Sequence, residues 1–215
     1  MLKYELEILE KLDPYDHVIW DWNGTLLNDA EMVIEVNNIL LRQHGLSEIT
    51  LEDYRHVFCH PVREYYRKLG FDLQKTPFEQ IGDQFIRLYK DRVDQVDVFA
   101  GAKEILATLQ SRKKAQWILS AAHQADLLQL LPRFGVAHFF AGVYGIGDHY
   151  ADGKVGRGKE LLQNIEADRG RIILVGDTDH DFEVAMHLGI DILLVSQGHQ
   201  SSQRLRALTG SVIGH

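Results

Sequence analysis

The sequence predicts an α/β fold, in which a doubly wound, mainly parallel sheet of Rossmann-like type carries an inserted all-helical cap domain. From residue 96 onwards, short apolar runs alternate with amphipathic segments, which is typical of a parallel sheet covered by helices on both faces. A single apolar run precedes residue 28, and only helical periodicity follows it up to residue 95. With 215 residues, of which 45% are hydrophobic, the chain can bury a substantial core.

The N-terminal half is predicted to hold a short helix in the first ten residues, a strand over 17–21 and then four helices. Asn28 is a suitable N-cap for the first of the four, and Gly45 lies just past its expected end at His44. Thr50 begins the second with acidic residues in its first turn, Pro61 suits the first turn of a third that ends near Gly70, and Thr76-Pro77 begins the fourth.

The C-terminal half is predicted to alternate between the two element types. The expected strands cover 115–120, 139–143, 171–175 and 191–195, and the expected helices cover 102–110, 124–134, 157–167 and 182–188. These boundaries predict an α/β core of residues 1–27 and 96–215 and a helical cap domain of residues 28–95.

Charge and composition exclude several classes of protein. The net charge of −8 argues against nucleic acid as the main partner, because phosphate backbones require a basic face. No apolar run approaches the ~20 residues that a membrane span needs. Cys59 is the only cysteine, and the charged N-terminus does not resemble a secretory signal, so we expect a cytoplasmic protein.

The segment around Asp21 carries the strongest functional signal. A short apolar strand ends on Asp21, and the chain then turns through Trp22-Asn23-Gly24-Thr25. Ligands of parallel α/β sheets bind beside the carboxyl ends of the strands. A carboxylate held there next to free backbone N–H groups can attack a phosphoryl group. The alternative is an Asx turn that simply closes the strand.

Two further strand ends carry polar residues. Ser120 ends one strand, where its hydroxyl can donate to a phosphoryl oxygen or cap the next helix. Another apolar strand runs into Gly176-Asp177, and Asp181 follows four residues later. Neighbouring carboxylates repel each other unless a cation lies between them, and Mg²⁺ prefers oxygen ligands. Helix capping and acids favoured in a first helical turn are the alternative explanation.

A glycine-rich segment, Gly153-Lys154-Val155-Gly156-Arg157-Gly158-Lys159, precedes the helix expected at 157–167. A lysine at this position can neutralise the charge shared by a phosphate and nearby carboxylates. Both Lys154 and Lys159 are candidates, and solvated lysines in a surface loop are the alternative.

Taken in order, these four segments resemble the motifs of the haloacid-dehalogenase-like hydrolase superfamily, and the helical insertion resembles the cap of its phosphoglycolate-phosphatase-like branch. The resemblance implies a Mg²⁺-dependent phosphatase of a small phosphorylated metabolite, in which Asp21 forms an aspartyl-phosphate. It implies metal ligands Asp21, Asn23 through its backbone carbonyl, Asp177 and Asp181. It also implies that the phosphoryl oxygens are held by Gly24, Thr25, Ser120 and Lys154. Arg63, Tyr65 and Tyr66 of the cap are candidates for facing the substrate, or for a solvated helix face.

One position departs from the family pattern. Phosphatases of this family usually carry an aspartate acid/base two residues after the nucleophile, and here that residue is Asn23, whose amide cannot exchange a proton near neutral pH. The chain is then a slow phosphatase or one for good leaving groups, a phosphotransferase, or a binding module for a phosphorylated metabolite with little turnover. A phosphonoacetaldehyde-hydrolase-like enzyme, which needs a cap lysine, is a further alternative; the cap lysines are Lys68, Lys75 and Lys90.

Overall fold

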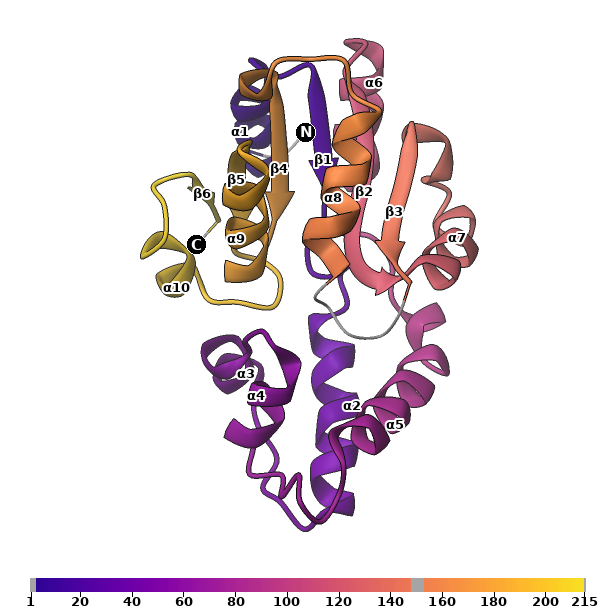
Figure 1. Ribbon diagram of the computed structural model, residues 1–215, viewed down its shortest axis with the longest axis vertical. Coiled ribbons are helices and arrows are strands. Elements are labelled where there is room, and N and C mark those ends of the chain that lie inside the picture. The colour runs from indigo at the N-terminus through magenta and orange to yellow at the C-terminus, as the bar shows by residue number, and fades with distance from the viewer. Residues whose placement is uncertain (1–2, 148–152, 215) are drawn as a thin grey trace.

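The computed structural model describes residues 3–147 and 153–214, and within these residues it confirms the predicted fold class. Six parallel strands form one sheet in the order β3-β2-β1-β4-β5-β6 (Figure 1). The strands are β1 His17–Trp20, β2 Ala115–His123, β3 Gly142–Ile146, β4 Ile172–Gly176, β5 Asp191–Val195 and β6 Val212–Ile213.

The register of the central strands brings distant segments of the sequence together. Trp20 of β1 lies opposite Ile118 of β2 on one side and Val175 of β4 on the other. Since all three strands are parallel, the residues that follow these positions emerge at the same edge of the sheet. Asp21, Ser120 and Asp177 are therefore neighbours in space although they are far apart in the chain.

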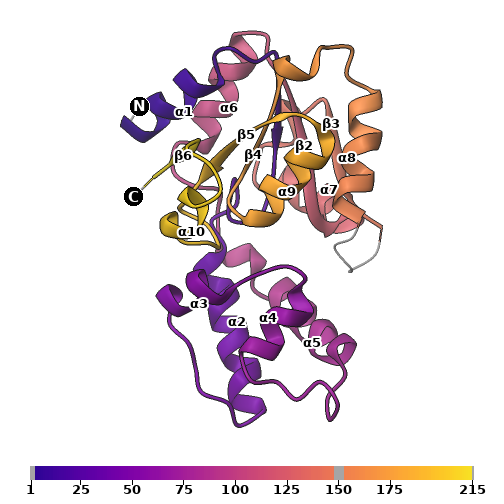
Figure 2. The same ribbon diagram turned by 60° about the vertical axis from the view of Figure 1, so that its left-hand side comes forward.

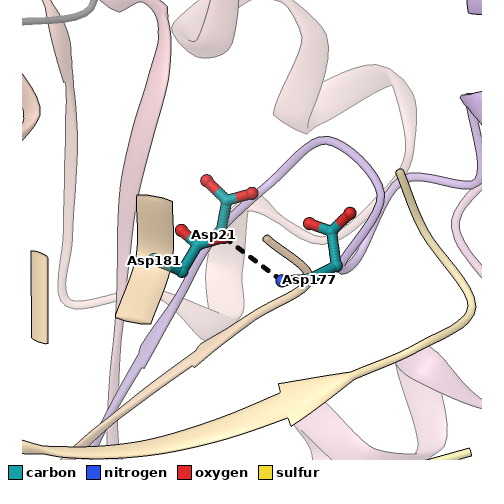
Figure 3. Close-up of side chains that lie close together, drawn as sticks. All are labelled: Asp21, Asp177 and Asp181. Carbon is teal, nitrogen blue, oxygen red and sulfur yellow. Dashed lines mark hydrogen bonds between the residues drawn. The ribbon is translucent and has the colours of Figure 1, made fainter. Parts of the chain in front are cut away.

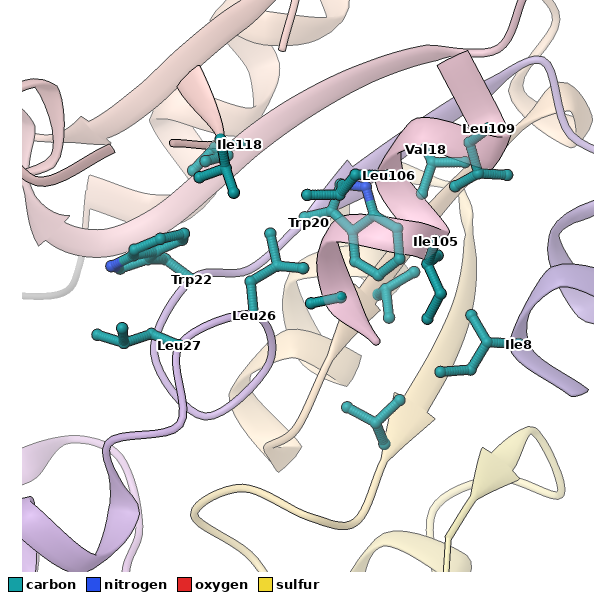
Figure 4. Close-up of a cluster of buried hydrophobic side chains, with 14 of the residues drawn as sticks. Ile8, Val18, Trp20, Trp22, Leu26, Leu27, Ile105, Leu106, Leu109 and Ile118 are labelled. Carbon is teal, nitrogen blue, oxygen red and sulfur yellow. The ribbon is translucent and has the colours of Figure 1, made fainter. Parts of the chain in front are cut away.

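Helices cover both faces of the sheet. On one face, α1 Lys3–Leu12, α6 Ala102–Ser111 and α7 Gln124–Arg133 pack against alternate strand residues such as Val18 and Trp20 (Figure 4). On the other, α8 Gly153–Gln163, α9 Asp179–Leu188 and α10 Ser202–Arg206 pack against residues of the opposite pleat, such as Ile19 and Leu174. Because the strands are buried on both sides, they appear in the sequence as continuous apolar runs rather than alternating ones.

The inserted helices form a second body at the carboxyl edge of the sheet (Figure 2). They are α2 Ala30–Gln43, α3 Leu51–Val57, α4 Val62–Lys68 and α5 Phe78–Lys90. Two apolar clusters of their own hold them together, one around Tyr54 and Tyr65 and one around Leu40 and Ile81. No helix of the described chain has the length and apolar character that a bilayer span needs.

Several predicted boundaries are correct and others are wrong for identifiable reasons. Thr50 caps α3 through a capping box with Asp53, as expected. The cap predicted at Asn28 is wrong: Asp29 precedes α2 and makes no cap bond, because its carboxylate is used elsewhere. Helix α8 begins at Gly153 rather than 157. The start of α8 was not predicted because glycines, which disfavour helix, occupy its first turns. A Cβ on Gly158 would lie 2.6 Å from Leu188 Cδ1, so the close packing of α8 on α9 requires a glycine there.

The end of the sheet was also incompletely predicted. Strand β3 lies three residues later than expected, and the short elements α10 and β6 were not predicted at all. Helix α10 has five residues and β6 has two, which is too short for either to show a recognisable periodicity. Their position is fixed by pairing with β5 and by burial of Leu205 against the sheet.

Candidate active site

Three buried carboxylates meet at the carboxyl edge of the sheet (Figure 3). Asp21 follows β1, Asp177 follows β4, and Asp181 lies in the first turn of α9. Each offers one oxygen, and these oxygens all lie within 4.8 Å of one another. The three oxygens are therefore close enough together to bind one cation.

Lys154 supplies the positive charge of this cluster. Its Nζ atom donates to Asp21 Oδ1 at 2.7 Å and to Asp181 Oδ1 at 2.5 Å, and the lysine is only 2% exposed. Lys159, the other candidate, is exposed to solvent. Lys154 reaches the carboxylates because α8 begins at Gly153, which places Lys154 in the first turn of the helix, at the carboxyl edge of the sheet.

The pKa values show that negative charge is in excess here. Burial raises the pKa of Asp21 to about 7 despite the neighbouring Lys154, and burial raises that of Asp177 to about 6. Burial acts in the same direction on Asp181, but Lys154 and the hydrogen bond from Thr178 outweigh it and lower its pKa to about 2. Lys154 thus offsets burial at Asp181, whereas at Asp21 and Asp177 burial outweighs the favourable contacts with Lys154 and His199.

The residues present fit a divalent cation. A hard cation such as Mg²⁺ takes oxygen ligands from one or two carboxylates and leaves room for phosphate and water. Asp21, Asp177 and Asp181 each offer one oxygen to such an ion. All three carboxylates also accept hydrogen bonds within the protein: Asp21 from Lys154, Asp177 from the Thr25 hydroxyl and the His199 N–H, and Asp181 from the N–H groups of Asp177 and Thr178 and from the Thr178 hydroxyl. Asp181 also orients Lys154 and the Asp177 loop through its hydrogen bonds.

In the structure, the hydrogen-bonding groups of Gly24 and Thr25 are engaged within the protein. The Thr25 hydroxyl donates to Asp177 Oδ1 at 2.9 Å, and the Gly24 N–H donates to Leu27 O and to Asp29 Oδ1. Neither group is free for a phosphoryl oxygen. Instead, Thr25 orients Asp177, and the positive φ of Gly24, +71°, lets the turn pass close to the Asp177 carboxylate.

Gly198 gives a direct test of how tightly Asp177 is held. A Cβ there would lie 2.1 Å from Asp177 Oδ2 and 2.3 Å from Gly24 O, so Gly198→Ala must displace the carboxylate. We expect this change to lower the free energy of unfolding by about 1–3 kcal/mol and to weaken Mg²⁺ binding. Urea unfolding and calorimetric titration with Mg²⁺ would measure both. Gly210→Ala is the matched control, since a Cβ there meets nothing within 4 Å; equal behaviour of the two variants would contradict the prediction.

A hydrogen-bond network that the sequence did not reveal surrounds Asn23. Its Nδ2 atom donates to Asp29 Oδ2 at 2.7 Å and to the Tyr89 hydroxyl at 2.7 Å, and Tyr89 in turn donates to Asp29 Oδ2 at 2.9 Å. Asp29 is fully buried and also accepts from His199 Nε2 at 3.2 Å. The network therefore fixes the Asn23 amide with its NH₂ group towards Asp29.

His199 makes Asp29 a stable carboxylate. Burial opposes a charged imidazole, but Asp29 outweighs it and raises the pKa of His199 to about 9. Burial likewise opposes a charged Asp29, yet His199 holds the pKa of this carboxyl below its usual range. The ion pair and the Tyr54 hydroxyl, 2.9 Å from His199 Nδ1, keep Asp29 ionised, so it does not replace the proton donor that Asn23 lacks.

A cavity of about 470 Å³ opens between this cluster and the inserted helices. Ser120 lines it; its Oγ accepts from the Ala122 N–H, which leaves the hydroxyl hydrogen available for a phosphoryl oxygen. Tyr65 and Tyr66 also line it. Arg63 does not lie among the described residues that line the cavity; it is exposed, pairs with Glu79 and lies over the Phe78 ring.

The lysines of the inserted helices are engaged elsewhere. Lys90 lines the cavity but pairs with Asp126 at 2.7 Å. Lys68 donates to Cys59 Sγ, and Lys75 is a surface residue paired with Asp72. The arrangement thus offers no support for a lysine that forms a Schiff base at this site.

Asp29, Tyr89 and His199 are the site residues that sequence reasoning missed. Only His199 had a recognisable signal, because Gly198-His199 follows the apolar run of β5 at the same sheet edge as Asp177. Tyr89 appeared only as one apolar position of an amphipathic helix. Asp29 was overlooked because Asn28 next to it suggested an ordinary helix cap.

The fold and this site define a class of protein: a parallel α/β core whose carboxyl edge holds an acidic cluster and a buried lysine beneath a helical insertion. A model of the haloacid dehalogenase-like hydrolase family matches residues 18–195. The chain belongs to this family.

Similar proteins agree with this assignment. The phosphoglycolate phosphatase of Synechococcus elongatus is 25% identical over 196 residues, which cover 88% of each chain. A 5'-nucleotidase of Pseudomonas aeruginosa is 23% identical and covers 90% of this chain and 88% of its own. Among solved structures, the haloacid dehalogenase-like family protein SP0104 from Streptococcus pneumoniae superposes with a TM-score of 0.79 at 20% identity, covering 94% of this chain and 95% of that one.

Proposed function

We propose that this chain hydrolyses a small phosphomonoester with Mg²⁺ by transient phosphorylation of Asp21. The observation that carries the proposal is the placement of the Asp21 carboxylate within 4.8 Å of the Asp177 and Asp181 oxygens, with Lys154 bonded to its Oδ1 atom. Lys154 fixes the orientation of the carboxylate and leaves Oδ2 as the attacking oxygen. The family and the phosphatase relatives support the same chemistry.

In the first step, Asp21 Oδ2 forms a bond to phosphorus while the bond from phosphorus to the ester oxygen of the substrate breaks. In the second, a water molecule displaces Asp21, which releases inorganic phosphate and restores the carboxylate. A divalent cation held by Asp21 and Asp177 would neutralise charge on the phosphoryl oxygens. Those oxygens would be held by Lys154 and the Ser120 hydroxyl. The N–H groups of Trp22 and Asn23 would also donate to them, since neither finds a backbone acceptor in the described chain.

Asn23 limits both steps. Its NH₂ group faces Asp29 and Tyr89, and an amide supplies no exchangeable proton for the leaving group or the attacking water. General acid–base help contributes about 10²–10⁴-fold to rates of this kind. The proposed enzyme is therefore slow towards poor leaving groups and holds its phosphorylated form for longer.

Metal removal tests the proposal. We expect the protein to release phosphate from an aryl phosphate in the presence of Mg²⁺, to lose this activity with EDTA and to regain it when Mg²⁺ is restored. Acid quenching during turnover is expected to trap phosphate on the protein. The competing function is a binding module: thermal stabilisation by phosphorylated compounds without phosphate release from any of them would favour it and reject the hydrolase.

A further inference from the structure

We infer that the leaving group of the substrate is an uncharged, largely apolar ring system carrying a hydrogen-bonding group, and not a short carboxylate such as glycolate. This inference rests on the proposed function and concerns the same cavity. The cavity opens directly from the Asp21 cluster into the inserted helices, so it receives the part of the substrate that lies beyond phosphorus. Its volume of about 470 Å³ is in the range of sites for small organic ligands and exceeds what glycolate fills.

The walls contributed by the inserted helices are apolar and aromatic. Rings gain stacking and edge contacts with such walls in addition to the burial of their area. The residues that provide this surface include Val33, Phe58, Val62, Phe78, Phe85 and Ile86.

The depth of the cavity follows from α2. Asp29, Val33 and Asn37 are spaced four residues apart, so they share one face of the helix, and all three line the cavity. Asn37 lies eight residues after Asp29, which corresponds to about 12 Å along the helix axis. A leaving group that reaches Asn37 must therefore extend well past Val33.

Three residues of the insertion that line the cavity have a buried side-chain polar atom without a hydrogen-bond partner among the described residues: Asn37, His60 and Tyr65. The Tyr65 hydroxyl and Asn37 Oδ1 are buried without a hydrogen bond among the described residues, and the two side chains belong to residues that are 2% and 1% exposed. An unpaired buried polar atom costs free energy, so a ligand group that bonds to it is favoured. A hydroxyl or N–H on the far end of the substrate would satisfy either atom.

The charged residues around the cavity argue against a leaving group that carries a carboxylate. Each lysine and arginine among the described residues that line the cavity already pairs with a carboxylate of the protein: Lys154 with Asp21 and Asp181, Lys90 with Asp126 and Arg133 with Asp94. A carboxylate buried between the aromatic rings would meet no free cation, and burial of an unpaired charge is strongly unfavourable.

The absence of a carboxylic acid at residue 23 also favours an aryl leaving group. Asn23 cannot protonate the departing oxygen, and a phenol-like oxygen departs without a proton far more readily than an alkoxide does. Both halves of the site, the reacting end and the cavity, therefore favour an aryl phosphate.

The test compares kcat/KM for 1-naphthyl phosphate, phenyl phosphate and phosphoglycolate with Mg²⁺. The two aryl leaving groups are of similar acidity, so a difference between them reports contact with the cavity. We expect naphthyl phosphate to exceed phenyl phosphate by about tenfold, from the additional ring area buried, and phosphoglycolate to be the poorest of the three. Turnover with phosphoglycolate as the best substrate, or with equal values for the two aryl esters, overturns the inference and leaves the proposed function standing. Failure to hydrolyse any of the three overturns both.

Two variants test whether the preference for naphthyl phosphate arises from contacts in the cavity. Ile86→Lys places a cation in the apolar wall and is expected to abolish the naphthyl preference and to raise kcat/KM for phosphoglycolate. Gln84→Lys adds the same charge to the same helix outside the cavity lining and is the matched control. Identical substrate preferences in the two variants would contradict the assignment.

Tyr65→Phe tests the unpartnered hydroxyl independently of the substrates. Because this hydroxyl makes no bond within the described protein, its removal is expected to raise Tm by about 2–4 °C. A lower Tm would show that the hydroxyl is bonded inside the protein and would contradict its assignment to a ligand.

Discussion

Replacement of Asp21 by asparagine is expected to lower turnover of an aryl phosphate by about 10⁴-fold or more while the protein remains folded. The amide is nearly isosteric with the carboxylate but does not attack phosphorus. The fold is expected to tolerate the change because Asp21 is one of two carboxylates whose pKa burial raises, so removal of its charge relieves repulsion within the cluster. Steady-state phosphate release and thermal unfolding would measure the two effects, and acid quenching of Asp21→Asn should trap no phosphate on the protein.

Asp16→Asn provides the matched control. Asp16 immediately precedes β1, and its carboxylate forms an exposed ion pair with Arg171 on the opposite edge of the sheet. The same chemical change there is expected to leave kcat within about twofold of wild type, since exposed ion pairs contribute little. Equal activity of Asp21→Asn and Asp16→Asn would reject Asp21 as the nucleophile.

Asn23→Asp is expected to change both stability and rate. The new carboxylate would replace an amide nitrogen that lies 2.7 Å from Asp29 Oδ2, so the two acids would share one buried site. We expect a loss of about 2 kcal/mol in the free energy of unfolding and a residue 23 carboxyl that stays protonated near neutral pH. A protonated acid at this position can serve the leaving group, so turnover is expected to rise by about 10²-fold where the variant is folded.

The double variant Asn23→Asp with Asp29→Asn separates these effects. It exchanges the amide and the carboxylate and so restores one hydrogen bond between opposite partners. The free energy of unfolding is expected to return towards the wild-type value. The double-mutant cycle should give a coupling energy of about 1 kcal/mol or more. The gain in rate should be largest for alkyl phosphates, and the initial burst of leaving group that we expect for the wild type should disappear. An unchanged rate in the folded double variant would show that Asn23 does not limit turnover.

The catalytic core was predictable because parallel sheets convert sequence order into spatial order. Asp21 and Asp177 each follow a buried apolar strand, and Ser120 lies in the carboxyl-terminal half of another, so parallel register brings all three to one edge. The separation of the helical segment from the alternating segment was equally visible, since the periodicity changes at about residue 28 and again near residue 96. These are local patterns, and local patterns are what a single sequence displays.

The network behind Asn23 was not predictable for a physical reason. Asp29, Tyr89 and His199 come from the end of a loop, a helix in the insertion and the loop after β5. Their partnership exists only because the inserted helices lie against the carboxyl edge of the sheet. The same holds for Gly24 and Thr25: the sequence indicated a phosphate-binding turn, whereas the approach of Asp177 and Asp29 uses their hydrogen-bonding groups.

The sequence by itself determined the parallel α/β core, the position of the helical insertion and the four segments of the candidate site, because strand, turn and helix patterns depend on neighbouring residues. Only the tertiary structure decided that Lys154 rather than Lys159 joins the carboxylates, that Asp29 fixes Asn23, and that an aromatic cavity with paired cations lies beyond Asp21. Those features depend on distances between side chains that are remote in sequence, and burial makes each such distance decisive for charge and hydrogen bonding.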